Sequence, residues 1–285
     1  MTKLNGDLDK LCAELQRMVM DHLALPDLIE LGKTRNENNE GVKEYVEERR
    51  MILLGAFVED TSAFVNIMER TGSIIAGSSA LHLFQAKSEA LELQDLDVYA
   101  MQEFEGTLLE HFKDKEGYKG PKSIARKKEY DSSAITKVHK LQNGEKRVDI
   151  MITDWASAIV PIVQYHSTAW TKDKKNLVNP ITYMDDRNNI STILALMKYM
   201  QRGFRTSAEP FDMGIHNCHS SAYCPLTTRN TVDKGTLRWE FTPKKTVGKT
   251  NVTCDNLAII IWRLGGQGCI EEEDQSVETY IGVVA

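Results

Sequence analysis

Three aspartates set in apolar segments are the residues of this chain best placed to do chemistry. Asp95 and Asp97 stand two positions apart, and Asp149 lies inside a second apolar run. Residues two apart on a strand project from the same face, so the first two carboxylates would point together while Leu96 and Val98 face a core. A carboxylate in apolar surroundings is costly unless a cation or a donor compensates it. The three acids therefore predict a site for divalent cations.

A glycine-serine pair precedes these acids in the chain. Gly77 and Ser78 follow the apolar run Ile74 to Ala76, which is typical of a short buried strand. A turn without Cβ bulk lets backbone N–H groups approach a phosphate closely, and a helix start adds a favourable dipole. Carboxylates that hold divalent ions, facing a turn that holds phosphates, are what phosphoryl or nucleotidyl transfer requires.

Each feature also has a purely structural interpretation. Asp95 and Asp97 could be solvated acids at a hairpin edge, and Arg147 could form a salt bridge with Asp149 on the same face of its strand. The Gly-Ser pair could be a plain strand-to-helix turn capped by Ser79. The combination of the three features in this order favours a catalytic site.

The order of these motifs resembles the DNA polymerase β-type nucleotidyltransferase superfamily. More specifically, the chain is similar to uncharacterised nucleotidyltransferase-like proteins encoded in fungal genomes. One departure is the spacer from Ser78 to Asp95, which is longer than usual, so the helix after the Gly-Ser turn must be extended or followed by a loop. The resemblance spans roughly residues 50 to 240 and rests on residues 75–81, 95–99, 117–118, 148–153 and 165–168, and on Cys224-Pro225 with Arg229 and Asp233.

The resemblance implies an activity and a fold. The activity is metal-dependent transfer of a nucleoside monophosphate from a nucleoside triphosphate to an acceptor, which could be RNA, protein or a small molecule. Asp95 and Asp97 would bind two Mg²⁺ (or Mn²⁺), Asp149 would bind the catalytic ion and help activate the attacking hydroxyl, and Gly77 and Ser78 would hold the nucleotide. The fold would be α/β (α+β), a polymerase-β-like small mixed sheet backed by helices. A non-catalytic scaffold of the same fold, used as a structural or interaction protein, is the alternative hypothesis.

A second cluster combines the usual zinc ligands. It consists of His216, Cys218, His219 and Cys224, four histidines and cysteines within nine positions. Their spacing matches no common zinc motif, so a packed loop of reduced cysteines is the alternative to a Zn²⁺ site. Metal analysis of the purified protein separates the two.

Composition limits the class of protein. The 285 residues are 41% hydrophobic and 27% charged, which is ordinary for a globular protein, and the net charge is −6. Any contact with nucleic acid must therefore come from a local basic patch. The chain shows no signal-peptide pattern and no run of membrane-spanning length, so we expect a cytoplasmic protein without a membrane partner. Five unevenly spaced cysteines do not form a disulfide framework.

Hydrophobic periodicity and turn signals divide the chain into three parts. These are N-terminal helices over residues 1–71, a catalytic core over 72–170, and a C-terminal α+β region over 171–285 that completes the cleft. The predicted helices cover residues 7–31, 42–70, 81–91, 103–112 and 192–201, and a loop covers 32–41. A predicted hairpin joins a strand over 134–141 to one over 146–153 around the turn Asn143-Gly144. Further strands are predicted over 238–241, 257–262 and 279–284.

Overall fold

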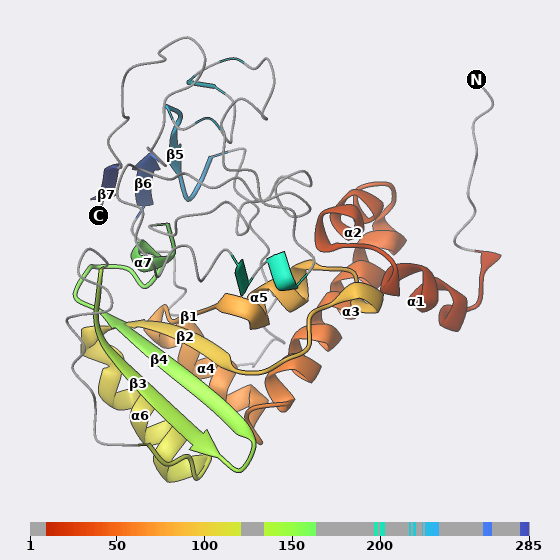
Figure 1. Ribbon diagram of the computed structural model, residues 1–285. Coiled ribbons are helices and arrows are strands. Elements are labelled where there is room, and N and C mark those ends of the chain that lie inside the picture. The colour runs from red at the N-terminus through yellow and green to blue at the C-terminus, as the bar shows by residue number, and fades with distance from the viewer. Residues whose placement is uncertain are drawn as a thin grey trace, which may run out of the picture.

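Two β-sheets organise the protein, whose structure is a computed structural model (Figure 1). The larger sheet has four strands in the order β1-β2-β4-β3, and the smaller has three in the order β5-β6-β7. Helices and a mixed sheet together confirm the expected α+β class. The structure describes residues 10–120, 134–163, 197–198, 200–202, 217, 219–220, 224, 226–233, 259–263 and 280–284.

The first predicted helix is in fact two. α1 (Ala13–Asp21) ends before a short turn, and α2 (Leu25–Gly32) carries a proline in its first turn. Pro26 has no N–H and its ring would clash with the carbonyl four residues earlier, so a continuous helix is excluded. A proline in the first turn of a new helix costs nothing, because that N–H has no helical partner.

The asparagine-rich segment predicted as a loop begins a helix instead. α3 runs from Asn36 to Gly55. Asparagine is a weak helix former, but tertiary packing overrides propensity. Here the apolar side chains Val42, Tyr45 and Val46 bury against Leu28 of α2, which stabilises the helix that the polar residues alone would not.

The second predicted helix breaks in the middle. After α3 ends, α4 (Thr61–Thr71) starts with Asp60, whose carboxylate accepts a hydrogen bond from the N–H of Ala63 at 2.8 Å. This is an N-cap of the usual kind. The buried carboxylate of Glu116 accepts bonds from the N–H groups of Glu59 and Asp60 at 2.7 and 3.2 Å. The stop at Thr71-Gly72 is confirmed, with Gly72 left-handed at φ 60°.

The four-stranded sheet contains the predicted apolar segments. Its strands are β1 (Ile74–Ala76), β2 (Leu96–Met101), β3 (Ile135–Asn143) and β4 (Lys146–Thr153). β2 pairs with β4 in parallel, and both edge pairings are antiparallel. The predicted hairpin is confirmed: Asn143 pairs with Lys146, leaving a two-residue turn in which Gly144 has φ 59°.

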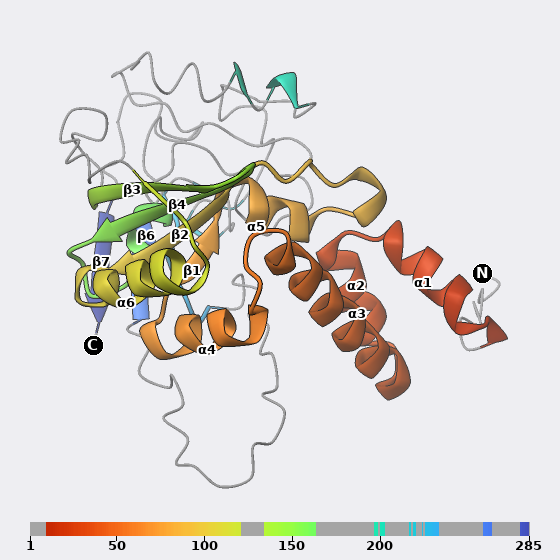
Figure 2. The same cartoon turned by 90° about the horizontal axis from the view of Figure 1, so that it is seen from below.

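Helices cover one face of this sheet. Figure 2 shows α4 and α6 (Glu105–Glu110) along the same side of the strands. The helical turn continues from α6 into a π-type segment, η4 (His111–Lys115), and this whole stretch confirms the helix predicted over 103–112. The core between helices and sheet contains Leu54, Phe64, Leu96, Val98, Leu108, Phe112, Val148, Ile150 and Ile152, all nearly inaccessible to solvent.

The remaining elements are short. α5 (Gly77–Phe84) follows β1 and is shorter than the helix predicted over 81–91. A 3₁₀ turn, η2 (Lys87–Glu89), follows α5, and a second one, η3 (Gln102–Phe104), follows β2. α7 (Val160–Val163) packs on the second sheet through Val160 and Ile260. That sheet consists of β5 (Thr228–Asn230), β6 (Ile259–Arg263) and β7 (Tyr280–Val284).

Two of these strands, β6 and β7, confirm strand predictions, whereas β5 was not predicted. The strand predicted over 238–241 and most of the helix predicted over 192–201 lie outside the described residues. Among the helices that the structure describes, none combines the length and the apolar character needed to cross a bilayer.

A buried arginine joins the N-terminal helices to α5. Arg49 of α3 is 7% exposed, and its guanidinium donates hydrogen bonds to the carbonyls of His82 and Gln85 at 2.9 and 3.0 Å. Those carbonyls lie at the end of α5, where helical partners are lacking. Arg49 also stacks over Tyr45, whose hydroxyl donates to Asp21 of α1. One side chain thus fixes the position of α5 relative to α1 and α3.

We predict that Arg49→Met lowers the free energy of unfolding by about 2–4 kcal/mol, because it leaves two carbonyls without a charged donor. Urea denaturation followed by circular dichroism measures the change. Lys43→Met, which removes a half-exposed charge paired with exposed Glu40 on the same helix, serves as the control and should change stability by under about 0.5 kcal/mol. Equal effects of the two substitutions would contradict the role given to Arg49.

Candidate active site

The face of the larger sheet opposite the helices carries two of the three predicted acids, Asp97 and Asp149, in one row. Strand register places Asp97 of β2 directly beside Asp149 of β4, and Ala76 of β1 and Lys140 of β3 complete the row on either side. Alternation sends Leu96 and Val98 into the helix-covered core, so Asp97 projects from the opposite face. The sequence predicts that Asp95 and Asp97 project from one face of a strand, but β2 begins at Leu96, immediately after Asp95. The parallel pairing of β2 with β4 is what brings Asp97 beside Asp149.

An apolar row borders the acids on one side. Tyr99 pairs with Met151, and these two side chains cluster with Ile74, Val138 and Ala158. On the other side of the acids, Asp95 immediately precedes β2 and Arg147 occupies β4, two residues before Asp149. This face of the sheet therefore changes from a buried apolar row to charged rows beside it.

The Gly-Ser turn lies against the acid row. Gly77 has φ +65°, a left-handed conformation that strongly favours glycine. A Cβ atom built on Gly77 would lie 1.7 Å from Oδ2 of Asp97. The carboxylate therefore occupies the space that any other side chain at position 77 would need. This contact explains why the turn before α5 requires glycine.

Both serines after Gly77 are bonded to Asp95. The Ser78 hydroxyl donates to the Asp95 carboxylate at 3.1 Å, and the Ser79 hydroxyl donates to the Asp95 carbonyl at 2.6 Å. The alternative in which Ser79 caps the helix is wrong, because the N-cap position belongs to Ala76 and no side chain caps the helix. These two hydrogen bonds hold together the two ends of the long spacer, the Gly-Ser turn at its start and Asp95 at its end.

Burial and like charge act together on the acids. Burial, followed by the charges of Asp95 and Asp149, raises the pKa of Asp97 to about 7. Burial and the charge of Asp95 also raise the pKa of Asp149, while the cations of Lys140 and Arg147 oppose that rise. The carboxylates are thus held close enough to repel one another, and none of the three forms an ion pair with any residue that the structure describes.

Two lysines near the acids were not predicted from the sequence. Lys140 lies next to Asp149 across β3 and β4, and Lys198 lies near enough to Asp97 for its charge to lower the pKa of that carboxyl. The position of Lys140 could have been found from the sequence, because a hairpin that turns after Asn143 pairs Lys140 with Asp149. No local pattern marked Lys198, because the approach of residues a hundred positions apart is set by tertiary structure.

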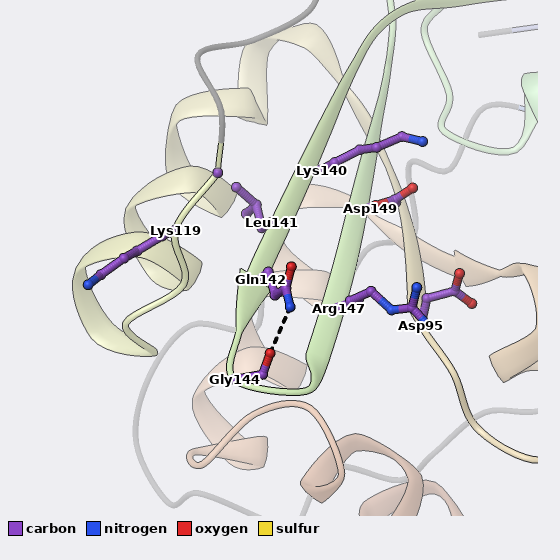
Figure 3. Close-up of a pocket in the computed structure, with 9 residues that line it drawn as sticks. Asp95, Lys119, Lys140, Leu141, Gln142, Gly144, Arg147 and Asp149 are labelled. Carbon is purple, nitrogen blue, oxygen red and sulfur yellow. Dashed lines mark hydrogen bonds between the residues drawn. The ribbon is translucent and has the colours of Figure 1, made fainter.

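A hollow of about 660 Å³ opens beside the acids. Its lining combines Asp95 and Asp149 with basic and polar groups of the β3–β4 hairpin and of the segment before it (Figure 3). In Figure 3 the side chains of Lys140, Arg147 and Asp149 rise from the same face of the hairpin. The lining residues are Asp95, Lys119, Gly120, Lys140, Leu141, Gln142, Gly144, Arg147 and Asp149.

The acids fit a magnesium ion by ligand type. Carboxylate oxygens are the protein ligands that Mg²⁺ prefers, and a cation between Asp97 and Asp149 would relieve their repulsion. Within the described ranges no three histidine, cysteine, aspartate or glutamate side chains converge as a complete ligand set. Magnesium in phosphate-transferring sites is usually held by one or two carboxylates together with substrate phosphates, so two neighbouring acids suffice for that kind of site.

The predicted zinc cluster is only partly described. His216 and Cys218 lie outside the described residues. Cys224 is fully buried, and His219 adopts a left-handed conformation at φ 62°. Zn²⁺ binding by the four residues stays a prediction, which metal analysis of the purified protein tests.

Comparison of the chain with protein-family models, with curated proteins and with solved structures finds no match. The interpretation of the site therefore depends on the residues themselves and on their arrangement.

Replacing Asp97 should reveal the repulsion in the acid row. Because its pKa in the folded protein is about 7 and its ordinary value is 3.8, the folded state disfavours the ionised form. Without metal, this group lowers stability progressively as pH rises from about 4 to about 7, by on the order of 2–4 kcal/mol. We predict that Asp97→Asn raises the free energy of unfolding at pH 8 and leaves it unchanged at pH 4, measured by urea denaturation in EDTA.

Asp114→Asn, which removes an exposed acid from η4 on the other side of the sheet, is the control and should show no such pH-dependent gain. A loss of stability in Asp97→Asn at pH 8 would instead make Asp97 a structural acid.

Gly77→Ala tests the contact between the turn and the acid row. A methyl group at this position overlaps the Asp97 carboxylate and strains the left-handed backbone, so we expect a loss of about 2 kcal/mol or more. Thermal unfolding measures it. The double substitution Gly77→Ala with Asp97→Ala should recover the steric part of that loss, leaving the cost of the left-handed backbone. If the second substitution recovers nothing, the two residues do not compete for the same space.

Proposed function

We propose that this protein is a metal-dependent nucleotidyltransferase that transfers a nucleoside monophosphate from a nucleoside triphosphate to an acceptor hydroxyl. The observation that carries the proposal is the contact of the Gly77 turn with Asp97, beside Asp149 in the same row. A glycine turn at a helix start and two adjacent, partly buried acids are the two halves of a site for a metal-bound triphosphate. The polymerase-β-like fold that the motifs resemble is part of the same proposal.

The turn would receive the phosphates. The backbone N–H groups at the start of α5 have no side-chain cap, and they carry the positive end of the helix dipole. Ser78 would exchange its bond with Asp95 for one with a phosphate oxygen. Lys198, already near Asp97, would add positive charge on the same side.

The acids would hold the cations and the acceptor. Asp97 and Asp149 would provide the carboxylate ligands for Mg²⁺ or Mn²⁺, and the negative charge of nearby Asp95 would add to the attraction for the cation. Bound there, the metal would supply charge neutralisation for the triphosphate and the pyrophosphate product. Asp149 would orient the acceptor hydroxyl and receive its proton. The hydroxyl oxygen would then bond to the α-phosphorus as the bond to the β-phosphate oxygen breaks and pyrophosphate departs.

Nucleotide binding tests this site directly. Unscreened carboxylates repel a triphosphate, so at least one of ATP, GTP, CTP and UTP should bind with Mg²⁺ and bind at least tenfold more weakly in EDTA. Isothermal titration calorimetry measures both. Asp97→Asn should remove the metal-dependent part, whereas Asp114→Asn should leave it intact. Binding that is equal with and without metal would place the nucleotide in a different pocket.

Transfer is then tested with each α-labelled nucleoside triphosphate, Mg²⁺ or Mn²⁺, and total RNA or protein extract. Label in one fraction identifies the acceptor class, and Asp97→Asn should abolish the labelling. If no nucleotide binds under any condition, the protein is better described as a non-catalytic scaffold that has kept this arrangement of strands and acids.

A further inference from the structure

The hollow beside the acids has a charge pattern that the triphosphate does not use. Lys140 and Arg147 both line it, and both are exposed. Neither forms an ion pair or a side-chain hydrogen bond with any residue in the part of the chain that the structure describes. In a chain of net charge −6, two such cations pointing into one hollow favour an anionic ligand there.

The two cations flank Asp149 in different directions (Figure 3). Lys140 lies in the row of Asp149, and Arg147 lies in the next row, paired with Gln142. Successive rows on one face of a sheet are about 7 Å apart. Two anionic groups of one ligand can therefore contact the two cations while a third group of that ligand reaches Asp149.

A glycine lets the segment before the hairpin pack closely against β3 at the wall of the hollow. Lys119 pairs with Gln142 through two backbone hydrogen bonds of 2.9 and 2.7 Å, which brings Gly120 against the outer edge of β3. A Cβ on Gly120 would lie 2.6 Å from the Lys140 carbonyl oxygen. The hollow measures about 660 Å³, a volume typical of sites for drug-sized ligands and more than a lone phosphate group requires.

We propose that this hollow binds the acceptor of the transfer reaction, and that the acceptor is a single-stranded nucleic acid. Its terminal hydroxyl lies at Asp149, and its last phosphates lie along Lys140 and Arg147. A nucleic-acid strand combines regularly repeated negative charges with a terminal hydroxyl, whereas an acidic peptide repeats the charge without that hydroxyl at its end. This inference rests on the proposed function, since it assigns the acceptor to the same acid row.

Strand binding is measurable without catalysis. Fluorescence anisotropy of a labelled single-stranded RNA of about ten nucleotides, with Mg²⁺ to screen the acids and without nucleotide, reports binding to the hollow in the absence of transfer. We expect Arg147→Glu and Lys140→Glu each to weaken binding by about tenfold or more at low salt. The double variant should also reduce the dependence of log Kd on log salt by about 1.4, because each lost phosphate contact contributes about 0.7.

Lys146→Glu is the matched control. Lys146 is adjacent to Arg147 on β4, but strand alternation turns it to the opposite face and it does not line the hollow. It should weaken binding by no more than about twofold. An effect equal to that of Arg147→Glu would show diffuse attraction to the hairpin and overturn the proposal, as would an absence of RNA binding.

Competitors separate the possible sources of the anion. A nucleoside monophosphate and a poly-glutamate peptide should each compete at least tenfold more weakly than unlabelled RNA. A monophosphate that competes equally well would assign the hollow to a small phosphorylated acceptor, and a peptide that does so would assign it to an acidic protein; either result overturns the proposal.

The same measurements distinguish this inference from the proposed function. RNA binding that depends on Arg147, without any metal-dependent nucleotide binding, would support the strand-binding surface and contradict nucleotidyl transfer. Metal-dependent nucleotide binding without RNA binding would support the transfer site and contradict this acceptor.

Discussion

The parallel pairing of β2 with β4 is the constraint on which the rest of the site depends. It puts Asp97 and Asp149 side by side on one face, and it puts Val98 and Ile150 side by side on the other. The apolar side is covered by α4 and α6 (Figure 2). Burial of that side supplies the free energy that holds the strands in register. Hydrophobic packing on one face of the sheet thus keeps like charges together on the opposite face, where they would otherwise separate.

The structure shows why strand-level features were predictable and helix boundaries were not. The β3–β4 hairpin, β6 and β7 follow from alternation and from the Asn143-Gly144 turn, which are local signals. The interruptions of the N-terminal helices depend on Pro26 and on the Asp60 cap, single residues within long apolar periodicities. A prediction based on hydrophobic periodicity alone therefore joins two helices into one across each of these residues.

The features of the candidate site also divide into those that a local motif predicts and those that depend on packing. The Gly-Ser turn and the acid row were predictable because each is a short motif within one strand or turn. The contact between Gly77 and Asp97 and the approach of Lys198 were not, because they depend on how separate elements pack. The bonds from Ser78 and Ser79 to Asp95 belong to this second group. These bonds join residues 16 and 17 positions apart, so no short sequence pattern indicates them.

The backbone bridge between Lys119 and Gln142 also limits how much of the sheet edge another strand can reach. Among the strands that the structure describes, β3 is the last of its sheet, and the outer edge of such a strand can offer N–H and C=O groups to other chains. The bridge occupies the Gln142 groups at one end of that edge, and exposed Lys140 places a charge two residues further along. Backbone pairing by another strand is therefore blocked at Gln142 and disfavoured by the charge at Lys140.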